Sequence, residues 1–227
     1  MTSRMSHCPW AKDPVSLHYH DTEWGVPTRD DRTLFEFLIL EGAQAGLSWD
    51  TILRKREAYR DAYDNFDAAR IAKYTTRDVT RLLAAAKGDE VTIVRNRLKV
   101  ESSISNARVF LEVQGAHGSF AKYIWSFVGG VPIQHKYESM KQITPTTAES
   151  DAMSKALKKL GFRFVGSTIC HAYMQAVGMV NDHLISCPRH RIVARAARPR
   201  VVKLERAFLS LGIAQIEGTH NAAHLIG

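Results

Sequence analysis

The chain has 227 residues, 45% of them hydrophobic and 24% charged, which is typical of a globular protein with one core or two lobes that share one. It holds three cysteines, too few for a disulfide framework, and a chain of this size can bury enough surface to fold without one. We find neither an apolar stretch of signal-peptide length after Met1 nor a run long enough to cross a bilayer, and we therefore expect a cytoplasmic protein.

The formal net charge of +8 is unevenly distributed. From Arg189 to the end there are seven Lys or Arg against two Glu, so this tail carries +5 and the first 188 residues carry +3. A basic surplus fits an anionic partner such as nucleic acid, but a solvated face explains it equally well.

The first predicted helix follows an irregular start and covers residues 31–41. It opens with acidic residues and is apolar on more than one face, which is typical of a buried helix. A second helix is predicted over 51–63, with Asp50 as its N-cap.

Two further helices are expected in the middle of the chain. Thr75 or Thr76 is placed to cap a helix over 78–86, and the segment 87–90 then breaks the pattern. A basic stretch beginning at Val94 opens the next helix, which continues through Phe110 and beyond.

In the C-terminal half, 129–132 is a predicted loop and 133–146 an extended, irregular crossing between lobes. Helix returns over 149–160, with Gly161 as its C-cap glycine, and a helix rich in Met, Ala and aromatic residues follows over 167–180. Cys170, inside that last helix, is interpreted as a packed thiol.

Several of these segments coincide with the motifs of one family. They read YHDTEWGVP at 19–27, LEGAQAGLSW at 40–49, WSF at 125–127, SKALKKLGFRFVGSTIC at 154–170, MQA at 174–176 and VNDH at 180–183. Together they resemble the bacterial 3-methyladenine DNA glycosylase I family, and the resemblance runs from about Cys8 to Cys187. It implies an all-α fold of the helix-hairpin-helix glycosylase type, with two helical lobes, a base pocket between them and a zinc site joining the termini.

Four residues near the two ends of this region form a set of zinc-binding type: Cys8, His20, His183 and Cys187. His183 and Cys187 are four apart and would share one face of a helix. Spacing alone leaves packing or surface roles open for all four, and it leaves His18 as a competing ligand. The resemblance implies one structural Zn²⁺ per chain on the four, a closed site that leaves no place for an activated water.

A carboxylate stands among aromatic residues in the N-terminal part of the chain. Glu41 follows four apolar residues and is costly to bury without a partner. The aromatic residues on their own are more typical of core than of a pocket. The resemblance implies that Glu41 contacts the methylated adenine, that Trp49 stacks on it and that Tyr19 shapes the site. The remaining candidate pocket residues are Trp10, Trp24 and Ser16.

Ser16 departs from the family, because many members have a pocket tyrosine there. One aromatic wall is then missing or is supplied by His18.

The chemistry of the lesion explains why this set suffices. An adenine alkylated at N3 is cationic in DNA, hence a better stacking partner and a better leaving group than a normal base. We therefore assign Glu41 as the catalytic group in the role of a discriminator, and we assign no separate general base.

The expected DNA contacts are Leu47, Arg95, Asn96, Arg97 and Lys99. Residues 45–48 lie between pocket residues and look suited to entering the duplex. The DNA-gripping hairpin over 87–97 is longer than is usual for the family and has Thr92 at the expected glycine.

The sequence thus predicts a monomeric glycosylase domain over 1–188 and a basic extension of unknown order over 189–227. Its predicted function is to flip 3-methyladenine, with 3-methylguanine as a second candidate, out of alkylated double-stranded DNA and release it by hydrolysis. Two alternatives remain: a non-catalytic module that binds DNA lesions, and a helical enzyme acting on free nucleosides.

Overall fold

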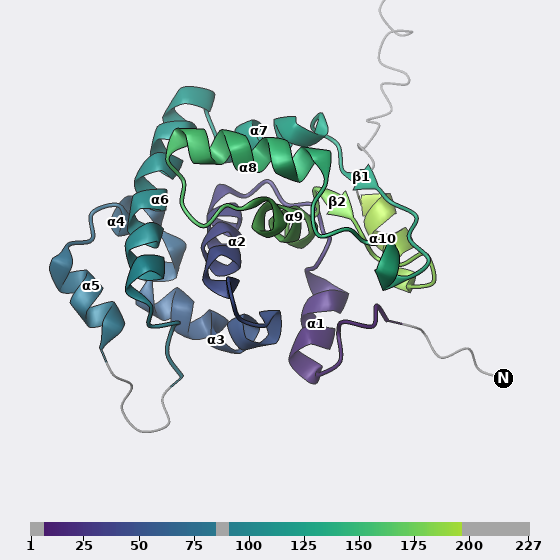
Figure 1. Ribbon diagram of the computed structural model, residues 1–227, viewed down its shortest axis with the longest axis horizontal. Coiled ribbons are helices and arrows are strands. Elements are labelled where there is room, and N and C mark those ends of the chain that lie inside the picture. The colour runs from purple at the N-terminus through teal and green to yellow at the C-terminus, as the bar shows by residue number, and fades with distance from the viewer. Residues whose placement is uncertain (1–6, 85–90, 197–227) are drawn as a thin grey trace, which may run out of the picture.

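Helices make up nearly all of the regular structure in this protein, whose computed structural model describes residues 7–84 and 91–196 (Figure 1). The first half contains α1 (Pro14–Thr22), α2 (Asp31–Gln44), α3 (Trp49–Ala62), η1 (Asp64–Phe66), α4 (Ala68–Ile71), α5 (Thr76–Leu83) and α6 (Arg97–His117). The second half contains α7 (Phe120–Trp125), η2 (Ser126–Val128), β1 (Ile133–Gln134), η3 (Met140–Gln142), α8 (Ala148–Leu160), α9 (Ser167–Ala176), β2 (Val180–Asn181) and α10 (Pro188–Ala196).

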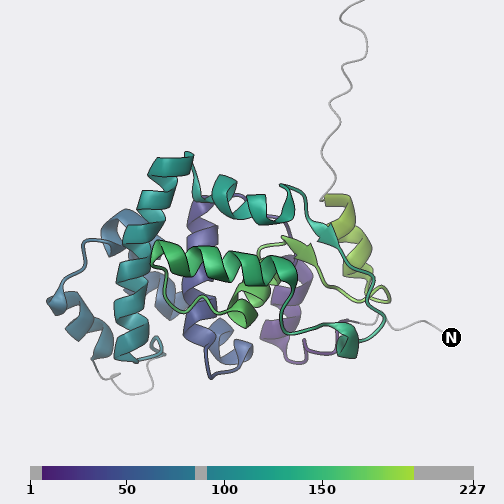
Figure 2. The same cartoon turned by 45° about the horizontal axis from the view of Figure 1, so that its top comes forward.

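Helix α2 lies at the centre of the molecule. It packs against α3, α6, α7 and α9, and every residue from Leu34 to Ala43 is buried. The prediction of a helix that is apolar nearly all round is therefore confirmed, with the helix three residues longer than expected. Both views place α4, α5 and α6 at one end of the molecule and α1, α10 and the two short strands at the other (Figures 1 and 2).

The predicted cap of α3 is wrong by two residues. Ser48 is the N-cap, and its Oγ accepts a hydrogen bond from Thr51 N at 3.2 Å. Asp50 lies instead in the first turn, where a carboxylate interacts favourably with the positive end of the helix dipole. The cap of α5 is Thr75, one of the two predicted candidates, and it forms a capping box with Asp78, so the helix begins two residues before the predicted start.

Helix α6 starts at Arg97, and Asn96 caps it by accepting from Lys99 N at 3.2 Å. The predicted break over 87–90 and residues 85 and 86 of the helix expected before it lie outside the described residues.

One helix was missed, because the start of the chain was expected to be irregular. Asp13 caps α1 by accepting from Val15 N and Ser16 N, and Pro14 occupies the first helical position, where its missing N–H costs nothing.

In the C-terminal half, α8 and its C-cap Gly161, with φ +98°, confirm the prediction. Helix α9 ends four residues earlier than predicted. Gly178, with φ +73°, turns the chain, and a Cβ there would lie 2.4 Å from Pro27 N, so only glycine fits this close approach. Residues beyond Gly178 then form β2, which pairs in parallel with β1 inside the segment expected to be irregular.

The basic extension predicted from residue 189 begins with ordered structure. Helix α10 covers its first eight residues, and Asn181 Nδ2 in β2 donates to His190 O at 3.0 Å. Residues 197–227 lie outside the described part of the chain. Among the described residues, no helix is long and apolar enough to span a membrane.

Candidate functional site

A cavity of about 430 Å³ opens between α1, α2, α3 and α9. Five of the six predicted pocket residues line it: Trp10, Tyr19, Trp24, Glu41 and Trp49. The rest of its lining comprises Gln44, four residues of the segment around η3 (Met140, Ile143, Thr144 and Pro145) and four residues on one face of α9 (Thr168, His171, Ala172 and Gln175).

The sixth predicted residue, Ser16, does not line the cavity. Its buried Oγ accepts hydrogen bonds from Lys12 N and Asp13 N, at 3.1 and 3.2 Å, and so serves the start of α1. His18 is exposed and lines neither this cavity nor the Cys/His group described below. The structure therefore supplies no aromatic wall from either position.

The aromatic side of the cavity is built from contacting rings. The centroids of Tyr19 and Trp49 lie 5.5 Å apart, and those of Trp10 and Trp24 lie 5.0 Å apart. Phe37 of α2 stacks on Trp49, at 6.4 Å and 25°, and fixes that ring from behind. Such a wall has the shape and the electron-rich faces to receive a planar, electron-poor ring.

Several polar atoms of the cavity are buried without any hydrogen-bond partner. They are Trp10 Nε1, Tyr19 OH, Trp49 Nε1 and Glu41 Oε2. Buried polar groups are normally paired, because leaving one unpaired costs free energy, typically about 1–3 kcal/mol. Their concentration around one cavity indicates that a polar ligand completes their hydrogen bonding.

Glu41 is the only one of these groups that can change its charge near neutral pH. It is 3% exposed, and burial raises the pKa of its carboxyl group from 4.5 to about 8. Burial therefore favours the protonated carboxyl group, and a bound cation would favour the carboxylate form.

A second polar cluster borders the cavity and was not found from the sequence. Asp182 is fully buried and accepts from His135 Nδ1 at 2.6 Å and from Gln175 Nε2 at 2.7 Å. His171 Nε2 lies 3.3 Å from the same carboxylate. These interactions lower the pKa of Asp182, and the hydrogen bond to Gln175 fixes one of the two neighbouring side chains, Gln175 and His171, that line the cavity. The sequence offered one indication of this cluster: His171 and Gln175 are four residues apart and so share one face of a helix.

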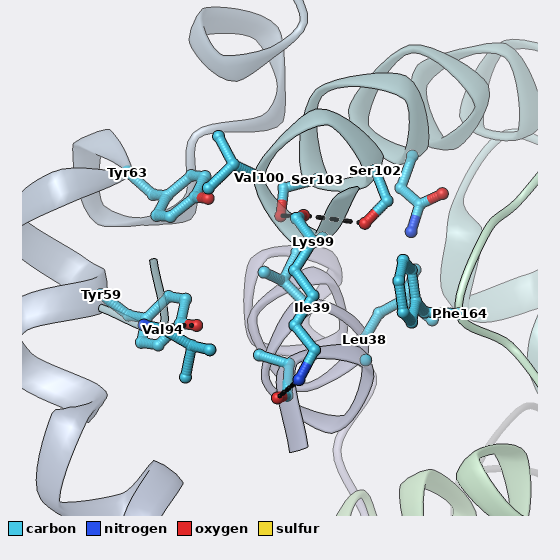
Figure 3. A pocket seen from close by; sticks show the side chains of 13 residues that line it. Leu38, Ile39, Tyr59, Tyr63, Val94, Lys99, Val100, Ser102, Ser103 and Phe164 are labelled. Carbon is cyan, nitrogen blue, oxygen red and sulfur yellow. Dashed lines mark hydrogen bonds between the residues drawn. The ribbon is translucent and has the colours of Figure 1, made fainter. Parts of the chain in front are cut away.

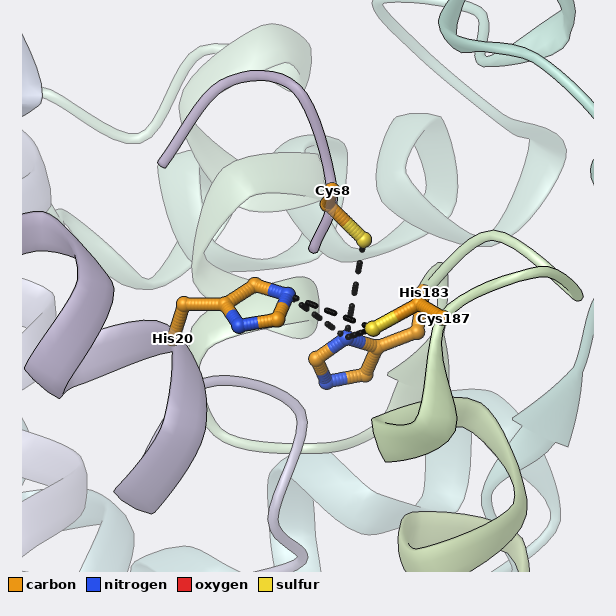
Figure 4. A group of neighbouring side chains, drawn as sticks. All are labelled: Cys8, His20, His183 and Cys187. Atoms are coloured by element: carbon orange, nitrogen blue, oxygen red, sulfur yellow. Dashed lines mark hydrogen bonds between the residues drawn. The ribbon is translucent and has the colours of Figure 1, made fainter. Parts of the chain in front are cut away.

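Near the two ends of the described region, four side chains form a buried Cys/His group, Cys8, His20, His183 and Cys187, which could hold a metal ion (Figure 4). Their donor atoms all lie within 4.8 Å of one another. His183 Nδ1 lies 3.2 Å from His20 Nε2, 3.7 Å from Cys8 Sγ and 3.9 Å from Cys187 Sγ. His183 and Cys187 do not lie on a helix, so helical spacing does not apply to them: α10 begins only at Pro188, and a turn brings the two together.

The outward nitrogens of both histidines are engaged. His20 Nδ1 donates to Asp21 Oδ1 at 2.7 Å, and His183 Nε2 donates to Trp24 O at 3.0 Å. These acceptors place the proton on the outward nitrogen and leave a lone pair on the one facing the group, as in metal-binding histidines. Contact between the two thiols lowers the pKa of Cys187 and raises that of Cys8, so the pair favours one metal-binding thiolate, on Cys187.

Cys170 lies outside this group. It is 2% exposed, and its Sγ donates to Val165 O, which confirms the interpretation as a packed thiol.

The five residues expected to contact DNA occupy two neighbouring segments. Leu47 is 41% exposed, in the connection between α2 and α3. Arg95 and Arg97 are exposed at the opening of α6, whereas Asn96 caps that helix with its side chain. Lys99 is half-buried, and its ammonium group bonds to backbone carbonyls of residues 43 and 45.

A helical fold that surrounds an aromatic cavity containing one buried carboxyl group defines the class of proteins that bind a planar base outside its stack. Within that class, the chain belongs to the methyladenine glycosylase family, whose model matches residues 10–190.

Curated relatives agree with this assignment. DNA-3-methyladenine glycosylase 1 of Escherichia coli (strain K12) is 45% identical over 184 residues, which are 81% of this chain and 96% of that protein. DNA-3-methyladenine glycosylase of Haemophilus influenzae is 43% identical over 189 residues, which are 83% of this chain and 98% of that protein.

Solved structures agree as well. A crystal structure of 3-methyladenine DNA glycosylase I has a TM-score of 0.76 and 49% identity, covering 80% of this chain and 98% of its own. The enzyme from Staphylococcus aureus, described for its recognition of 3-methyladenine, also has a TM-score of 0.76, with 36% identity and coverage of 87% and 99%.

Proposed function

We propose that this protein is a base-excision repair glycosylase that takes 3-methyladenine out of alkylated double-stranded DNA and releases it by hydrolysis of the N-glycosidic bond. The observation that carries the proposal is the aromatic cavity with its unpartnered donors and one buried carboxyl group. Its volume of about 430 Å³ accommodates a single extruded base. The relatives named above are supporting evidence, because the chain covers nearly all of their length.

The cavity selects its base by charge. Trp49 and Tyr19 offer electron-rich faces to a ring that carries a positive charge, and Glu41 offers a carboxyl group that gains most when it is ionised beside that charge. Neutral adenine gains much less from either contact. Glu41 therefore discriminates for the lesion and helps the departing base as a secondary effect.

The reaction itself requires little from the protein. The methylated base is already an activated leaving group, so the bond to the sugar breaks as water attacks a sugar cation that is forming. Glu41 removes no proton from that water in this scheme. We assign no general base, since the lesion supplies the activation that a base would otherwise provide.

The Cys/His group is proposed to hold one structural Zn²⁺. At Zn–N of about 2.0–2.1 Å and Zn–S of about 2.3 Å, the donor atoms of a tetrahedron stand about 3.3–3.8 Å apart. The separations of 3.2, 3.7 and 3.9 Å between His183 Nδ1 and the other donors fit this geometry. Four protein ligands fill the coordination shell, so the metal would hold the fold together and take no part in the chemistry.

Grip on DNA is proposed to come from the exposed Arg95 and Arg97, and Leu47 is proposed to enter the space that the extruded base leaves. Leu47 lies in the connection between two cavity residues, Gln44 and Trp49, and the two arginines lie at the start of α6. Arginines that contact phosphate fix register without reading sequence, which suits an enzyme that must search any sequence for damage.

The test is single-turnover release of base from methylated duplex DNA by the wild type and by Glu41→Gln. Charge-assisted contacts are worth roughly 1.5–3 kcal/mol each, so the variant should excise 3-methyladenine about ten- to a hundredfold more slowly. Duplex affinity should hardly change, and some activity should survive.

The outcomes separate the alternatives. Release of no base by folded wild type that still binds methylated duplex would indicate a lesion-binding module, and cleavage of free nucleosides alone would indicate a nucleoside hydrolase. Total loss of excision in Glu41→Gln with normal base binding would make Glu41 a general base. Glu112→Gln serves as a control because it makes the same chemical change at an exposed position of α6 that does not line the cavity.

A further inference from the structure

The connection between α2 and α3 is a tight turn that joins two pocket residues. Ala45 has φ −45° and ψ 114°, Gly46 has φ +79°, and Leu47 N donates to Gln44 O, as in a type II turn. Glu41 lies one turn of helix before it, and Trp49 begins α3 directly after it. The conformation of this turn therefore sets the position of exposed Leu47 relative to both.

Lys99 of α6 is hydrogen-bonded to the backbone of this turn. Its Nζ donates to Ala43 O at 2.8 Å and to Ala45 O at 2.7 Å, the carbonyls on either side of Gln44. Figure 3 shows the Lys99 side chain and the first of these two bonds. The side chain runs from the start of α6 to the end of α2, where the carbonyl groups give the helix its negative pole. Partial burial lowers the pKa of the Lys99 ammonium, but the two carbonyl contacts favour its charged form.

Lys99 also lies on the segment that is proposed to grip DNA. It follows exposed Arg97 by two residues, and Asn96, the cap of the same helix, accepts from its backbone N–H. The segment is itself anchored to α3, because Lys55 Nζ donates to Thr92 O at 2.7 Å and Val94 N donates to the hydroxyl of Tyr59 at 3.2 Å.

From these contacts we infer that Lys99 is a positioning residue that couples the DNA-gripping start of α6 to the turn carrying Leu47. It acts through two backbone carbonyls and not through a phosphate. The inference rests on the proposed function, since it assigns how the protein aligns its base pocket with bound duplex. It replaces the direct DNA contact that the sequence suggested for this lysine.

The distinction between a clamp and a phosphate contact is measurable. Each phosphate contact that is lost makes the salt dependence of duplex binding shallower by roughly one unit. Lys99→Met should leave that slope unchanged, whereas Arg97→Ala should reduce it. Lys99→Met should slow single-turnover excision from duplex about ten- to a hundredfold, the size of effect expected from a misplaced group. Binding of free 3-methyladenine, followed by tryptophan fluorescence, should stay within about twofold because the cavity itself remains.

A double-mutant cycle tests the route of the effect. If Lys99 acts through the position of Leu47, Lys99→Met should add little to the defect of Leu47→Ala, because residues that act as a unit are not additive. Lys99→Arg keeps a cation of similar length and should restore much of the duplex activity. Fluorescence of 2-aminopurine beside an abasic-site analogue in duplex DNA should report insertion by the wild type and less insertion by Lys99→Met.

Each result counts for or against the coupling. Full excision by Lys99→Met, full additivity with Leu47→Ala or a shallower salt slope would overturn it. A wild type that excises no 3-methyladenine would overturn the proposed function instead, and it is measured in the same assay. Should Lys99→Met fold poorly, a failure of Lys99→Arg to restore 2-aminopurine insertion would also count against the clamp.

Discussion

At the scale of single residues, the burial of Glu41 costs folding free energy that no contact among the described residues offsets. It is buried without a hydrogen bond to Oε2, and burial is the one cause of its raised pKa. An apolar side chain of similar volume would fit this place at lower cost. This cost falls when a cationic base provides the missing partner, as proposed for the cavity.

The raised pKa of Glu41 predicts how the stability of the folded protein depends on pH. The pKa of Glu41 is about 8 in the folded protein against an ordinary value of 4.5, so between these values the folded state keeps a proton that the unfolded state releases. The free energy of unfolding contributed by this group therefore decreases as the pH rises from 4.5 to 8. Glu41→Gln lacks the effect and should melt above the wild type by a margin that widens over this range.

Thermal melts of both proteins from pH 5 to pH 8 measure that margin. Glu112→Gln, which alters an exposed carboxylate on α6, is the control for the loss of one carboxylate outside the cavity. A constant difference between Glu41→Gln and wild type would show that Glu41 is already ionised in the folded protein.

For the candidate site, the sequence predicted some single residues correctly and misplaced or missed others. The aromatic pocket residues and Glu41 were predicted from the family motifs. Hydropathy alone does not distinguish a core role from a pocket role for the four aromatic residues. Ser16 was misplaced because a serine near a helix start serves the backbone at the helix N-terminus, here through its Oγ. His171 was missed because only the fold brings Asp182 to it from another segment.

At the scale of elements, helix caps explain most differences between prediction and structure. Ser48 and Asp50 are both good caps, and the sequence does not decide between them, whereas the turn fixed by Gly46 places Ser48 at the boundary. Helix α9 was predicted too long because Val177 and Met179 continue its apolar pattern. Gly178 ends the pattern where it must, since the chain passes against Pro27.

The first residues of α6 and those just before it carry the arginines that are expected to bind DNA. Replacing Arg95 and Arg97 by Ala should weaken duplex binding independently of sequence, and it should make the salt dependence shallower by roughly one unit per lost phosphate contact. Binding measured across a series of salt concentrations gives the slope. Replacing Lys155 and Lys159, two exposed lysines of α8, removes the same charge elsewhere and should leave the slope near that of the wild type.

An unchanged slope in the arginine variant would move the DNA surface away from α6. The next candidate would be the basic region from Arg189 onward, which carries most of the net charge.

At the scale of the whole molecule, the Cys/His group joins the two ends of the described chain. Cys8 and His20 come from the segment around α1, and His183 and Cys187 come from the turn before α10 (Figures 1 and 4). A link between points so far apart in the sequence removes much of the freedom of the unfolded chain. We therefore expect the metal to contribute more to stability than to any local structure.

Purified protein should contain close to one zinc, and Cys187→Ala should lose it. A loss of about 3 kcal/mol would lower the melting temperature by roughly 6–12 °C in a chain of this length. Base release by the folded fraction should continue at the normal rate. Metal analysis with thermal melts makes the measurement, and Cys170→Ala, which alters a buried thiol outside the group, should retain the metal.

A Cys187→Ala protein with normal stability and no bound metal would contradict the structural role. A folded, metal-free Cys187→Ala protein that no longer excises the base would instead indicate that the metal takes part in the chemistry.

The placement of the four ligands also fixes when the metal can be captured during synthesis. Cys8 and His20 are made first, and the other two side chains of the group follow about 160 residues later. A nascent or truncated chain that lacks His183 and Cys187 offers only half of the donors and cannot close the site. If the group holds a metal as proposed, its capture can be completed only in a chain that has been translated past residue 187.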